Sequence, residues 1–411
     1  MSPSIPRDRD RDPAGGGDGA PARARSLASH GRPVREARLG EFVAGRTRPM
    51  MAMVEVTNRC NMDCPVCFSD ANHPARDVPF DEIRRRLERL LAVTGTPIPI
   101  QLSGGEPTLR DDLEEVVGLA RSLGYRNVEL ITNGIRASRE ADLLPRLRAR
   151  GLTAVYLQFD GLRPATTTAI RGRDMSEVRE RAVAAARRAG LCCTLAVAVA
   201  RGVNDDELGD VVRFGVANID TVRAINFQSA TRFTGRFDLA AADRGYALPE
   251  LLALLERQTG LPADTFRSEH LGHPLCNAMS LVFVVDGRLE PLFKYVSREE
   301  MLRFLGDDRR EKVLGLFAGK REFFTRFLCN PRAWKLIAQA APIFGASPLN
   351  VLRAQHILLF AKSFMERDAL DPARVASCCY GITDQEGVYS FCAFNNLYRF
   401  PDRTRSESRA P

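Results

Sequence analysis

The sequence predicts an α/β protein whose parallel sheet is either doubly wound or rolled into an open barrel. From about residue 50 to 230, short apolar segments alternate with amphipathic ones. The apolar segments are nearly continuous hydrophobic runs, as expected for parallel strands buried on both faces. Six such strand–helix units in succession favour a parallel sheet joined by crossover connections.

Each element can be assigned in order. The strands are expected at 51–56, 98–103, 127–132, 154–159, 193–200 and 223–228. Residues 80–93 and 109–124 each have one apolar helical face, and the second helix should stop at Gly124. Ser176 can cap a helix that ends at Gly190, and Asn204 followed by Glu207 resembles a capping box.

Composition sets the wider limits. Of the 411 residues, 45% are hydrophobic and 27% charged, which is typical of a soluble globular enzyme. We expect disordered ends at 1–46 and 402–411, a core domain at 47–234 and a second domain at 235–401. No signal peptide or membrane-spanning run is visible, so a cytoplasmic location is expected, with peripheral contact at the inner face of the membrane as an option. The net charge of +8 is largely arginine, which GC-rich genomes also favour, and no nucleic-acid partner is expected.

The most informative motif is a run of three cysteines, Cys60, Cys64 and Cys67, directly after the first strand. A zinc site would need a fourth ligand, and none lies nearby in the sequence. Disulfides are disfavoured in the cytosol. Three thiolates in one short loop suit an iron–sulfur cubane in which the fourth iron stays open. The spacing therefore favours a [4Fe–4S] cluster, held by these three cysteines, at which chemistry can occur.

Further polar or glycine-rich residues follow the next three strands, at the edge of a parallel sheet where ligands bind. They are Gly104, Gly105, Glu106 and Pro107 after the second strand, Asn133 after the third, and Gln158 and Asp160 at the end of the fourth. The glycines would let the backbone approach a ligand, and a glutamate can accept from an amine. Ordinary turn and capping residues would explain each motif alone; their joint placement beside the cysteines favours a ligand site.

The region after residue 235 carries a second group of cysteines. Cys276 precedes an apolar hairpin with an Asp286-Gly287 turn, and Cys378, Cys379 and Cys392 bracket another hairpin. A second iron–sulfur site built from Cys276, Cys378 or Cys379, and Cys392 is predicted, with Cys329 or His273 as candidate fourth ligand. The alternative is a set of buried free cysteines. Cys192 and Cys193 lie inside a predicted strand and are expected to be packing residues.

The motifs CNMDCPVC, SGGEP and ITNG, with the sixfold strand–helix pattern, resemble the radical S-adenosylmethionine (SAM) superfamily. The resemblance implies a partial (β/α)6 TIM barrel with a C-terminal α+β extension that carries cysteines. It also implies that the open iron chelates the amino and carboxylate groups of SAM. Glu106 would hold the methionyl amine, with Gly104, Gly105 and Pro107 shaping that contact. Asn133, Gln158 and Asp160 would lie near the ribose and carboxylate, and residues 199–204, including Asn204, near adenine. Val66 departs from the aromatic residue that many members have before the third cysteine, which leaves the contact to adenine open.

The C-terminal layout is similar to the SPASM and twitch extensions of the superfamily. HPLCNAMSLVFVVDGRLEPL, SCCYG and FCAFNNLYR resemble the tetraether lipid synthase group more closely, which joins lipid tails by a bond between two unactivated carbons. The archaeal members of that group have a further cysteine-rich module upstream, whereas this chain has no cysteine before Cys60.

Several functional hypotheses remain open at this point. The leading one is a radical enzyme that acts on a lipid or other large hydrophobic substrate and takes electrons from a donor such as flavodoxin or ferredoxin. Residues 311–366 are apolar and helical in pattern, so they could line a lipid tunnel, rest on a membrane, or form a plain helical core. Peptide modification is the rival reaction, and a non-catalytic iron–sulfur protein that binds partners or senses redox state is the rival class.

Overall fold

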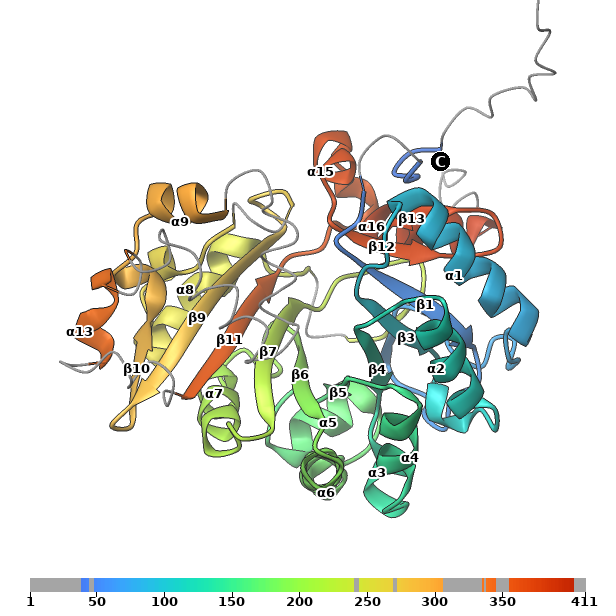
Figure 1. Ribbon diagram of the computed structural model, residues 1–411, viewed down its shortest axis with the longest axis horizontal. Helices are drawn as coiled ribbons and strands as arrows, with labels where there is room; N and C mark the ends of the chain where they lie inside the picture. The colour runs from blue at the N-terminus through green and yellow to red at the C-terminus, as the bar shows by residue number, and fades with distance from the viewer. Residues whose placement is uncertain are drawn as a thin grey trace, which may run out of the picture. The chain divides into compact units, whose positions relative to one another are not determined.

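The computed structural model describes residues 38–43, 48–239, 244–268, 272–305, 335, 338–344 and 355–402. The predicted alternation of strands and helices is confirmed. The six strands of the core are β1 (Met51–Thr57), β3 (Ile100–Gly104), β4 (Val128–Thr132), β5 (Ala154–Gln158), β6 (Cys192–Val199) and β7 (Val222–Ser229). They are hydrogen-bonded as parallel neighbours in the order β7-β6-β5-β4-β3-β1, which is the α/β partial barrel that the sequence predicted (Figure 1).

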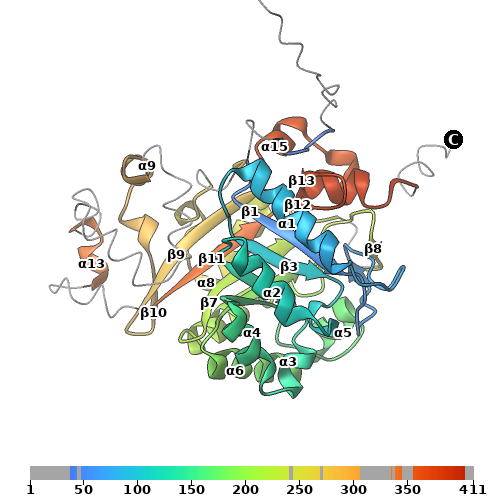
Figure 2. The same ribbon diagram turned by 45° about the vertical axis from the view of Figure 1, so that its right-hand side comes forward.

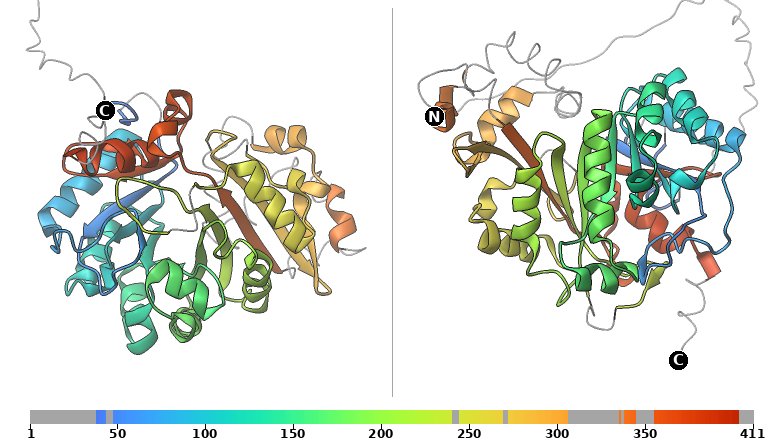
Figure 3. Two further views of the ribbon diagram at one scale, coloured as in Figure 1. Left: turned by 180° about the vertical axis from the view of Figure 1, so that it is seen from behind. Right: turned by 90° about the horizontal axis from the view of Figure 1, so that it is seen from below.

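The crossover helices lie on the outer side of this curved sheet (Figure 3, right). They are α1 (Phe80–Thr94), α2 (Leu113–Ser122), α3 (Ile135–Arg139), α4 (Leu143–Arg150), α5 (Pro164–Arg171), α6 (Ser176–Ala189) and α7 (Leu208–Ala217). Between sheet and helices lies the main hydrophobic core, in which Leu87, Val117, Leu130 and Leu195 are fully buried. Each such side chain contributes about 1.5–3 kcal/mol to folding.

The helix ends agree in part with the sequence. Gly190 ends α6 in the left-handed region, as predicted, while Met175 rather than Ser176 occupies its N-cap position. The predicted capping box at Asn204 and Glu207 is wrong. Asn204 accepts a hydrogen bond from the Ala200 amide, and the α7 N-cap, Glu207, forms no side-chain cap bond because it accepts from the amide of Leu162 instead.

Two C-terminal hairpins extend the same sheet at its two ends, giving eleven strands in the described part of the chain. At one end, β11 (Gln355–Lys362) lies parallel to β7 and antiparallel to β9 (Asn277–Val285), which pairs with β10 (Arg288–Pro291). At the other end, β12 (Tyr380–Thr383) lies parallel to β1 and antiparallel to β13 (Val388–Ser390). Figure 2 shows both extensions beside the core. Strands of the two predicted domains thus share one sheet, and the boundary near residue 235 stays a prediction.

The remaining elements are short or peripheral. They are a two-stranded sheet of β2 (Val66–Cys67) and β8 (Arg236–Phe237), the helices α8 (Leu248–Thr259), α9 (Arg298–Leu305), α13 (Ala341–Phe344), α15 (Pro372–Ala376) and α16 (Phe391–Ala393), a π-helical turn at Phe394–Tyr398, and 3-10 turns at Pro107–Leu109, Ala263–Thr265, Leu292–Lys294 and Arg367–Ala369. None of the described helices is long and apolar enough to cross a bilayer.

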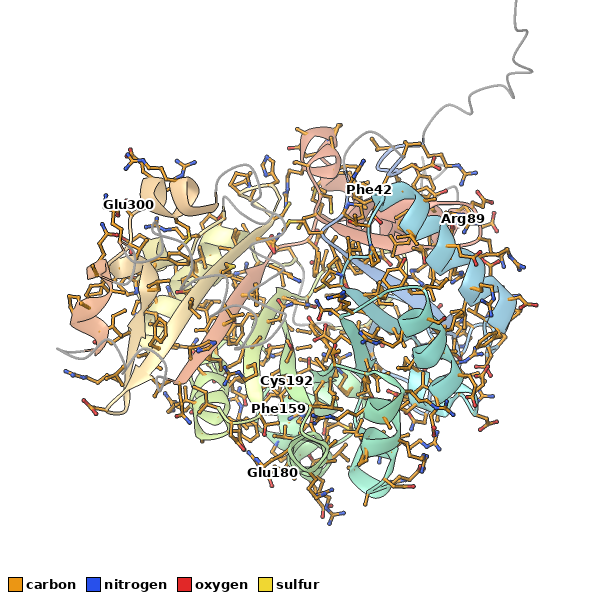
Figure 4. All side chains as sticks on the ribbon, in the orientation of Figure 1. Phe42, Arg89, Phe159, Glu180, Cys192 and Glu300 are labelled. Carbon is orange, nitrogen blue, oxygen red and sulfur yellow. The ribbon has the colours of Figure 1, made fainter. Side chains whose placement is uncertain are left out.

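Three expectations need correction. The predicted helical pattern of 311–366 does not hold for β11, which is a strand, while most of the rest of that segment lies outside the described residues. Residues 38–43 were expected to be disordered, yet Phe42 is buried and its amide donates to the carbonyl of Val388. Cys193 is buried as predicted, but Cys192, labelled in Figure 4 together with Phe42, is exposed at the start of β6.

Candidate active site

The cysteine loop begins where β1 ends, at the carboxyl edge of the barrel. The Cys60 amide donates to the Asn72 side-chain oxygen at 2.7 Å, and Cys67 is joined to Arg236 in the small β2–β8 sheet. Cys60, Cys64 and Cys67 are all partly buried. Burial, followed by the nearby Glu106 carboxylate and the other two cysteines, raises the pKa of Cys60 to about 12. A bound iron would reverse this shift, because a coordinating thiol is deprotonated.

Three thiols in one loop are a donor set that fits an iron–sulfur cluster. Within the part of the chain that the structure describes, no three His, Cys, Asp or Glu side chains are arranged as ligands of one metal ion. A cluster takes its thiolates on different irons, so its cysteines lie farther apart than the ligands of one ion. Cys60 and Cys64 pack against the same apolar cluster of Met62, Ile135 and Met175, and Cys67 follows in the same loop.

Gly104 and Gly105 permit a close approach of two backbones. The Gly105 amide donates to the Thr57 carbonyl at 2.8 Å. A Cβ atom at Gly105 would lie 2.1 Å from the Arg59 carbonyl oxygen, and Gly104 has a φ of 130° with the Thr57 carbonyl 1.9 Å from its added Cβ. The sequence predicted that these glycines would let the backbone approach a ligand. In the structure they let the turn after β3 pack against the start of the cysteine loop.

Glu106 lies beneath that turn with 1% of its surface exposed. Its carboxylate accepts from the Thr108 hydroxyl at 2.6 Å, the Thr132 hydroxyl at 2.8 Å and the Asn133 amide at 2.7 Å. Burial raises the pKa of Glu106, and these bonds act against the rise. Pro107 begins a 3-10 turn directly after β3. In this structure Glu106 connects that turn to the loop after β4 through its hydrogen bonds. Its contact with a methionyl amine stays a prediction.

Asn133 does lie beside the cysteine loop, as predicted. Its side-chain nitrogen donates to Asn61 at 2.8 Å, and its side-chain oxygen accepts from the Ile135 amide at 3.0 Å. Asn133 therefore connects the third strand end with the segment between Cys60 and Cys64.

Gln158, Asp160 and Asn204 are also brought together, but they bind one another. Asp160, at a φ of 64° and 1% exposed, accepts from the Gln158 amide at 2.8 Å, and the Asn204 amide donates to the Asp160 carbonyl at 2.7 Å. Asp160 also forms an ion pair of 2.7 Å with Arg171. Burial acts to raise the pKa of Asp160, but the Arg171 charge and hydrogen bonds leave it below its ordinary value.

Sequence reasoning missed Arg171. Its guanidinium donates to the Val66 carbonyl at 3.2 Å inside the cysteine loop. Burial raises the pKa of the Cys64 thiol, and the charge of Arg171 acts to lower it. Nothing local marks this arginine among the many others of the chain, because its role depends on the contact between α5 and the loop. It places a positive charge beside the thiols, where a ligand carboxylate would be favoured.

The C-terminal cysteines gather from three segments. The Asn277 amide donates to the Cys379 sulfur at 3.6 Å. Burial, followed by the charges of Cys379, Cys392 and Cys276, raises the pKa of Cys378. The electrostatic effects of Cys276, Cys379 and Cys392 on Cys378 favour a common site, which stays a prediction. The His273 ring accepts from the Leu275 amide at 3.2 Å, and Cys329 lies outside the described residues.

A cluster of aromatic rings connects the two cysteine groups. Phe391 precedes Cys392. Its ring centroid lies 5.5 Å from that of Phe68, 5.0 Å from that of Phe364 and 5.3 Å from that of Tyr380. Phe68 follows Cys67 directly. Phe68, Phe364 and Tyr380 pack against this cluster and keep part of their surface exposed.

The inner face of the barrel also carries polar side chains that sequence reasoning missed. The Gln101 amide donates to Glu129 at 2.5 Å, and the Tyr380 hydroxyl donates to Gln101. Between β7 and β5, which flank β6, the Asn226 amide donates to the Tyr156 hydroxyl at 2.8 Å. Glu129, a charged residue inside an apolar strand, was the signal that could have revealed this network.

The parallel partial barrel and the three-thiol loop at its carboxyl edge define an enzyme class that combines an iron–sulfur cluster with SAM. Residues 54–215 match the model of the radical SAM superfamily. The chain is 30% identical over 396 residues to 7,8-dihydro-6-hydroxymethylpterin dimethyltransferase of Methanocaldococcus jannaschii, covering 86% of this chain and 78% of the relative. The chain belongs to the radical SAM superfamily, whose members bind a [4Fe–4S] cluster and SAM.

Other similarities are more limited. GTP 3',8-cyclase of Stenotrophomonas maltophilia is 31% identical over 235 residues, which is 56% of this chain and 70% of the relative. SuiB of Streptococcus suis bound to S-adenosylmethionine, a solved structure, is 18% identical with a TM-score of 0.41. That similarity covers 51% of this chain and 47% of SuiB.

Proposed function

We propose that this radical SAM enzyme removes hydrogen from an unactivated carbon of a lipid-like or other large hydrophobic substrate, and that it forms a carbon–carbon bond there. When bound to Cys60, Cys64 and Cys67 and reduced, the cluster supplies the electron that cleaves SAM to a 5'-deoxyadenosyl radical. Cys276, Cys378, Cys379 and Cys392 would hold an auxiliary iron–sulfur cluster.

The observation that carries the substrate proposal is the aromatic cluster. Partly exposed rings of Phe68, Phe364 and Tyr380 surround Phe391 between the two cysteine groups. An apolar chain placed there would remove these rings from water, which is favourable by about 25 cal/mol per Å². The same rings would exclude water from a reactive radical. The resemblance of the C-terminal motifs to the tetraether lipid synthase group supports the same substrate class.

The first test is SAM cleavage. Anaerobically reconstituted protein with SAM and dithionite is expected to yield 5'-deoxyadenosine, measured by liquid chromatography and mass spectrometry. Joint replacement of Cys60, Cys64 and Cys67 by Ala should abolish the product, while Cys192→Ala, at an exposed cysteine, should not. Absence of 5'-deoxyadenosine from the loaded wild-type protein would favour a non-catalytic iron–sulfur protein.

The second test addresses the substrate. Lipid profiles of a deletion strain and its parent should differ in species whose chains are joined, and purified enzyme should transfer deuterium from a chain-labelled lipid to 5'-deoxyadenosine. Unchanged lipids and no deuterium transfer would contradict the lipid proposal.

A second candidate substrate is a bicyclic nitrogen heterocycle of the pterin or guanine type. The relatives named for a dihydropterin and for GTP support it, as does the network of Glu129, Gln101 and Tyr380, since carboxylate and amide groups recognise such rings. Replacing Glu129 by Gln would then raise KM for the heterocycle. With a lipid substrate, KM would change little, because the chain would lie at the aromatic cluster.

A further inference from the structure

A guanidinium lies against the C-terminal cysteines. Arg374, on α15, donates through Nε to the Cys276 sulfur at 3.3 Å and through a terminal nitrogen to the Ser363 carbonyl at 3.2 Å. Its charge also acts on the Cys392 thiol. Within the described residues Arg374 forms no ion pair with a carboxylate; the Asp371 carboxylate accepts from its backbone amide at 3.4 Å and not from its guanidinium.

An ammonium also lies near these cysteines. Lys362, the last residue of β11, is paired in register with Asn277, whose side chain bonds the Cys379 sulfur. The Lys362 ammonium is 5.2 Å from the centre of the Tyr380 ring, and Tyr380 follows Cys379. Like Arg374, Lys362 has no ion-pair partner in the described parts of the chain. The Glu129 carboxylate acts on Lys362 electrostatically but forms no ion pair with it, and it accepts a hydrogen bond from Gln101.

The Cys60 loop has a different electrostatic setting. Arg171 is paired with Asp160 at 2.7 Å, and Arg236 with Asp70 at 3.0 Å. The Glu106 carboxylate adds a negative charge whose effect reaches Cys60. Positive charges beside this loop therefore form ion pairs with carboxylates, whereas Lys362 and Arg374 form none with the described residues.

Reduction adds a negative charge to a cluster, so nearby uncompensated cations favour the reduced state and raise the potential. We propose that Lys362 and Arg374 raise the reduction potential of the auxiliary centre above that of the Cys60–Cys64–Cys67 centre. An electron that equilibrates between the two centres then resides on the auxiliary one. This inference rests on the auxiliary cluster of the proposed function. Lys362 and Arg374 act here as positioning charges and not as catalytic residues.

The test uses the full-length chain with Cys60, Cys64 and Cys67 replaced by Ala, so that only the auxiliary centre can be loaded. Its potential is measured by redox titration followed by electron paramagnetic resonance. Lys362→Met and Arg374→Gln should each lower the potential; a tenfold weaker electron affinity corresponds to 59 mV for one electron. Lys362→Arg and Arg374→Lys, which keep the charge, should stay near the parent value. Lys294→Met, at an exposed lysine paired with Glu290, is the matched control and should change nothing.

The outcomes separate the two proposals. A triple-alanine protein that takes up no iron would contradict the auxiliary centre itself. A loaded auxiliary centre whose potential is the same with and without the two charges would overturn the inference. So would a wild-type protein in which the Cys60 centre is reduced before the auxiliary one. Because each charge is removed separately, failure of one variant to fold leaves the other as the test.

Discussion

At the scale of single residues, the candidate site depends on buried charges that bind one another. Asp160 and Arg171 are 1% and 13% exposed at their side chains, and their ion pair lies against the loop that carries Cys64. A buried ion pair gives little net stability compared with an apolar pair, but removing one partner leaves an uncompensated charge. The position of the Arg171 charge beside the cysteine loop therefore depends on its ion pair with Asp160.

Replacing Asp160 by Asn is expected to lower the free energy of unfolding by about 3–5 kcal/mol, because Arg171 keeps its charge in a buried place. Urea denaturation of wild-type and variant protein measures the change. Asp210→Asn, at an exposed ion pair with Arg213, is the matched control and should cost less than about 1 kcal/mol. Equal losses in the two variants would show that burial does not control the cost.

The same pair predicts a pH dependence. The pKa of Asp160 in the folded protein is below its ordinary value, although burial opposes this, because Arg171 stabilises the carboxylate. The stability that the ionised Asp160 carboxylate contributes to the folded protein is therefore complete above its unfolded pKa of about 3.9. That stability is lost as the pH falls through the pKa of Asp160 in the folded protein. As the pH is lowered, the wild-type protein should lose stability more steeply than the Arg171→Gln variant. Urea unfolding midpoints measured across the acid pH range test this. Parallel pH curves would contradict this role of the pair.

At the scale of elements, the turn after β3 is fitted to the end of β1. The Gly105 amide and the Glu106 amide donate to the carbonyls of Thr57 and Arg59, at 2.8 and 2.7 Å. These backbone bonds join the second strand unit to the loop that carries Cys60. The position of the cysteines is thus determined by contact between two strand ends that are about 50 residues apart in sequence.

Gly105→Ala is expected to separate these two loops, because its Cβ would lie 2.1 Å from a backbone oxygen that cannot rotate away. We expect a loss of more than about 3 kcal/mol in unfolding free energy and of iron binding at the first site. Gly118→Ala on α2, where an added Cβ meets nothing within 4 Å, is the control and should stabilise by about 0.5–1 kcal/mol. Iron content and thermal unfolding of the two variants measure the effect; full iron loading in Gly105→Ala would refute it.

At the scale of the whole molecule, distant parts of the chain meet beside the second cysteine group. The Ser390 amide donates to the Gly40 carbonyl at 2.7 Å, and the Tyr398 hydroxyl donates to the Leu39 carbonyl at 3.1 Å. Arg399 pairs with Glu55 on β1 at 2.6 Å. Residues 38–43 and the C-terminal hairpin therefore support each other around Cys392.

Gly40→Ala tests this contact. Gly40 has a φ of 74°, and its added Cβ would lie 2.6 Å from the Ser390 hydroxyl and 2.8 Å from the Ala393 Cβ. Gly202→Ala is the control, because Gly202 has a φ of 70° and an added Cβ there would meet no atom within 4 Å. It has the conformational cost of a left-handed alanine, about 1–2 kcal/mol, without the steric clash. Gly40→Ala should lose more stability than this control in thermal unfolding. If the two variants unfold alike, residues 38–43 do not support the hairpin.

The sequence by itself indicated six parallel strand–helix units and the loop of Cys60, Cys64 and Cys67, because strand periodicity, glycine stops and cysteine spacing are local signals. The choice of a partial barrel over a doubly wound sheet came from the resemblance to the radical SAM superfamily. It also indicated that Cys276, Cys378, Cys379 and Cys392 belong together. Only the tertiary structure decided which groups face one another. It paired Asp160 with Arg171, placed Glu106 under the Asn133 loop, and set Lys362 and Arg374 against the second cysteine group. Those relations depend on contacts between residues far apart in the chain, and no local pattern of residues records them.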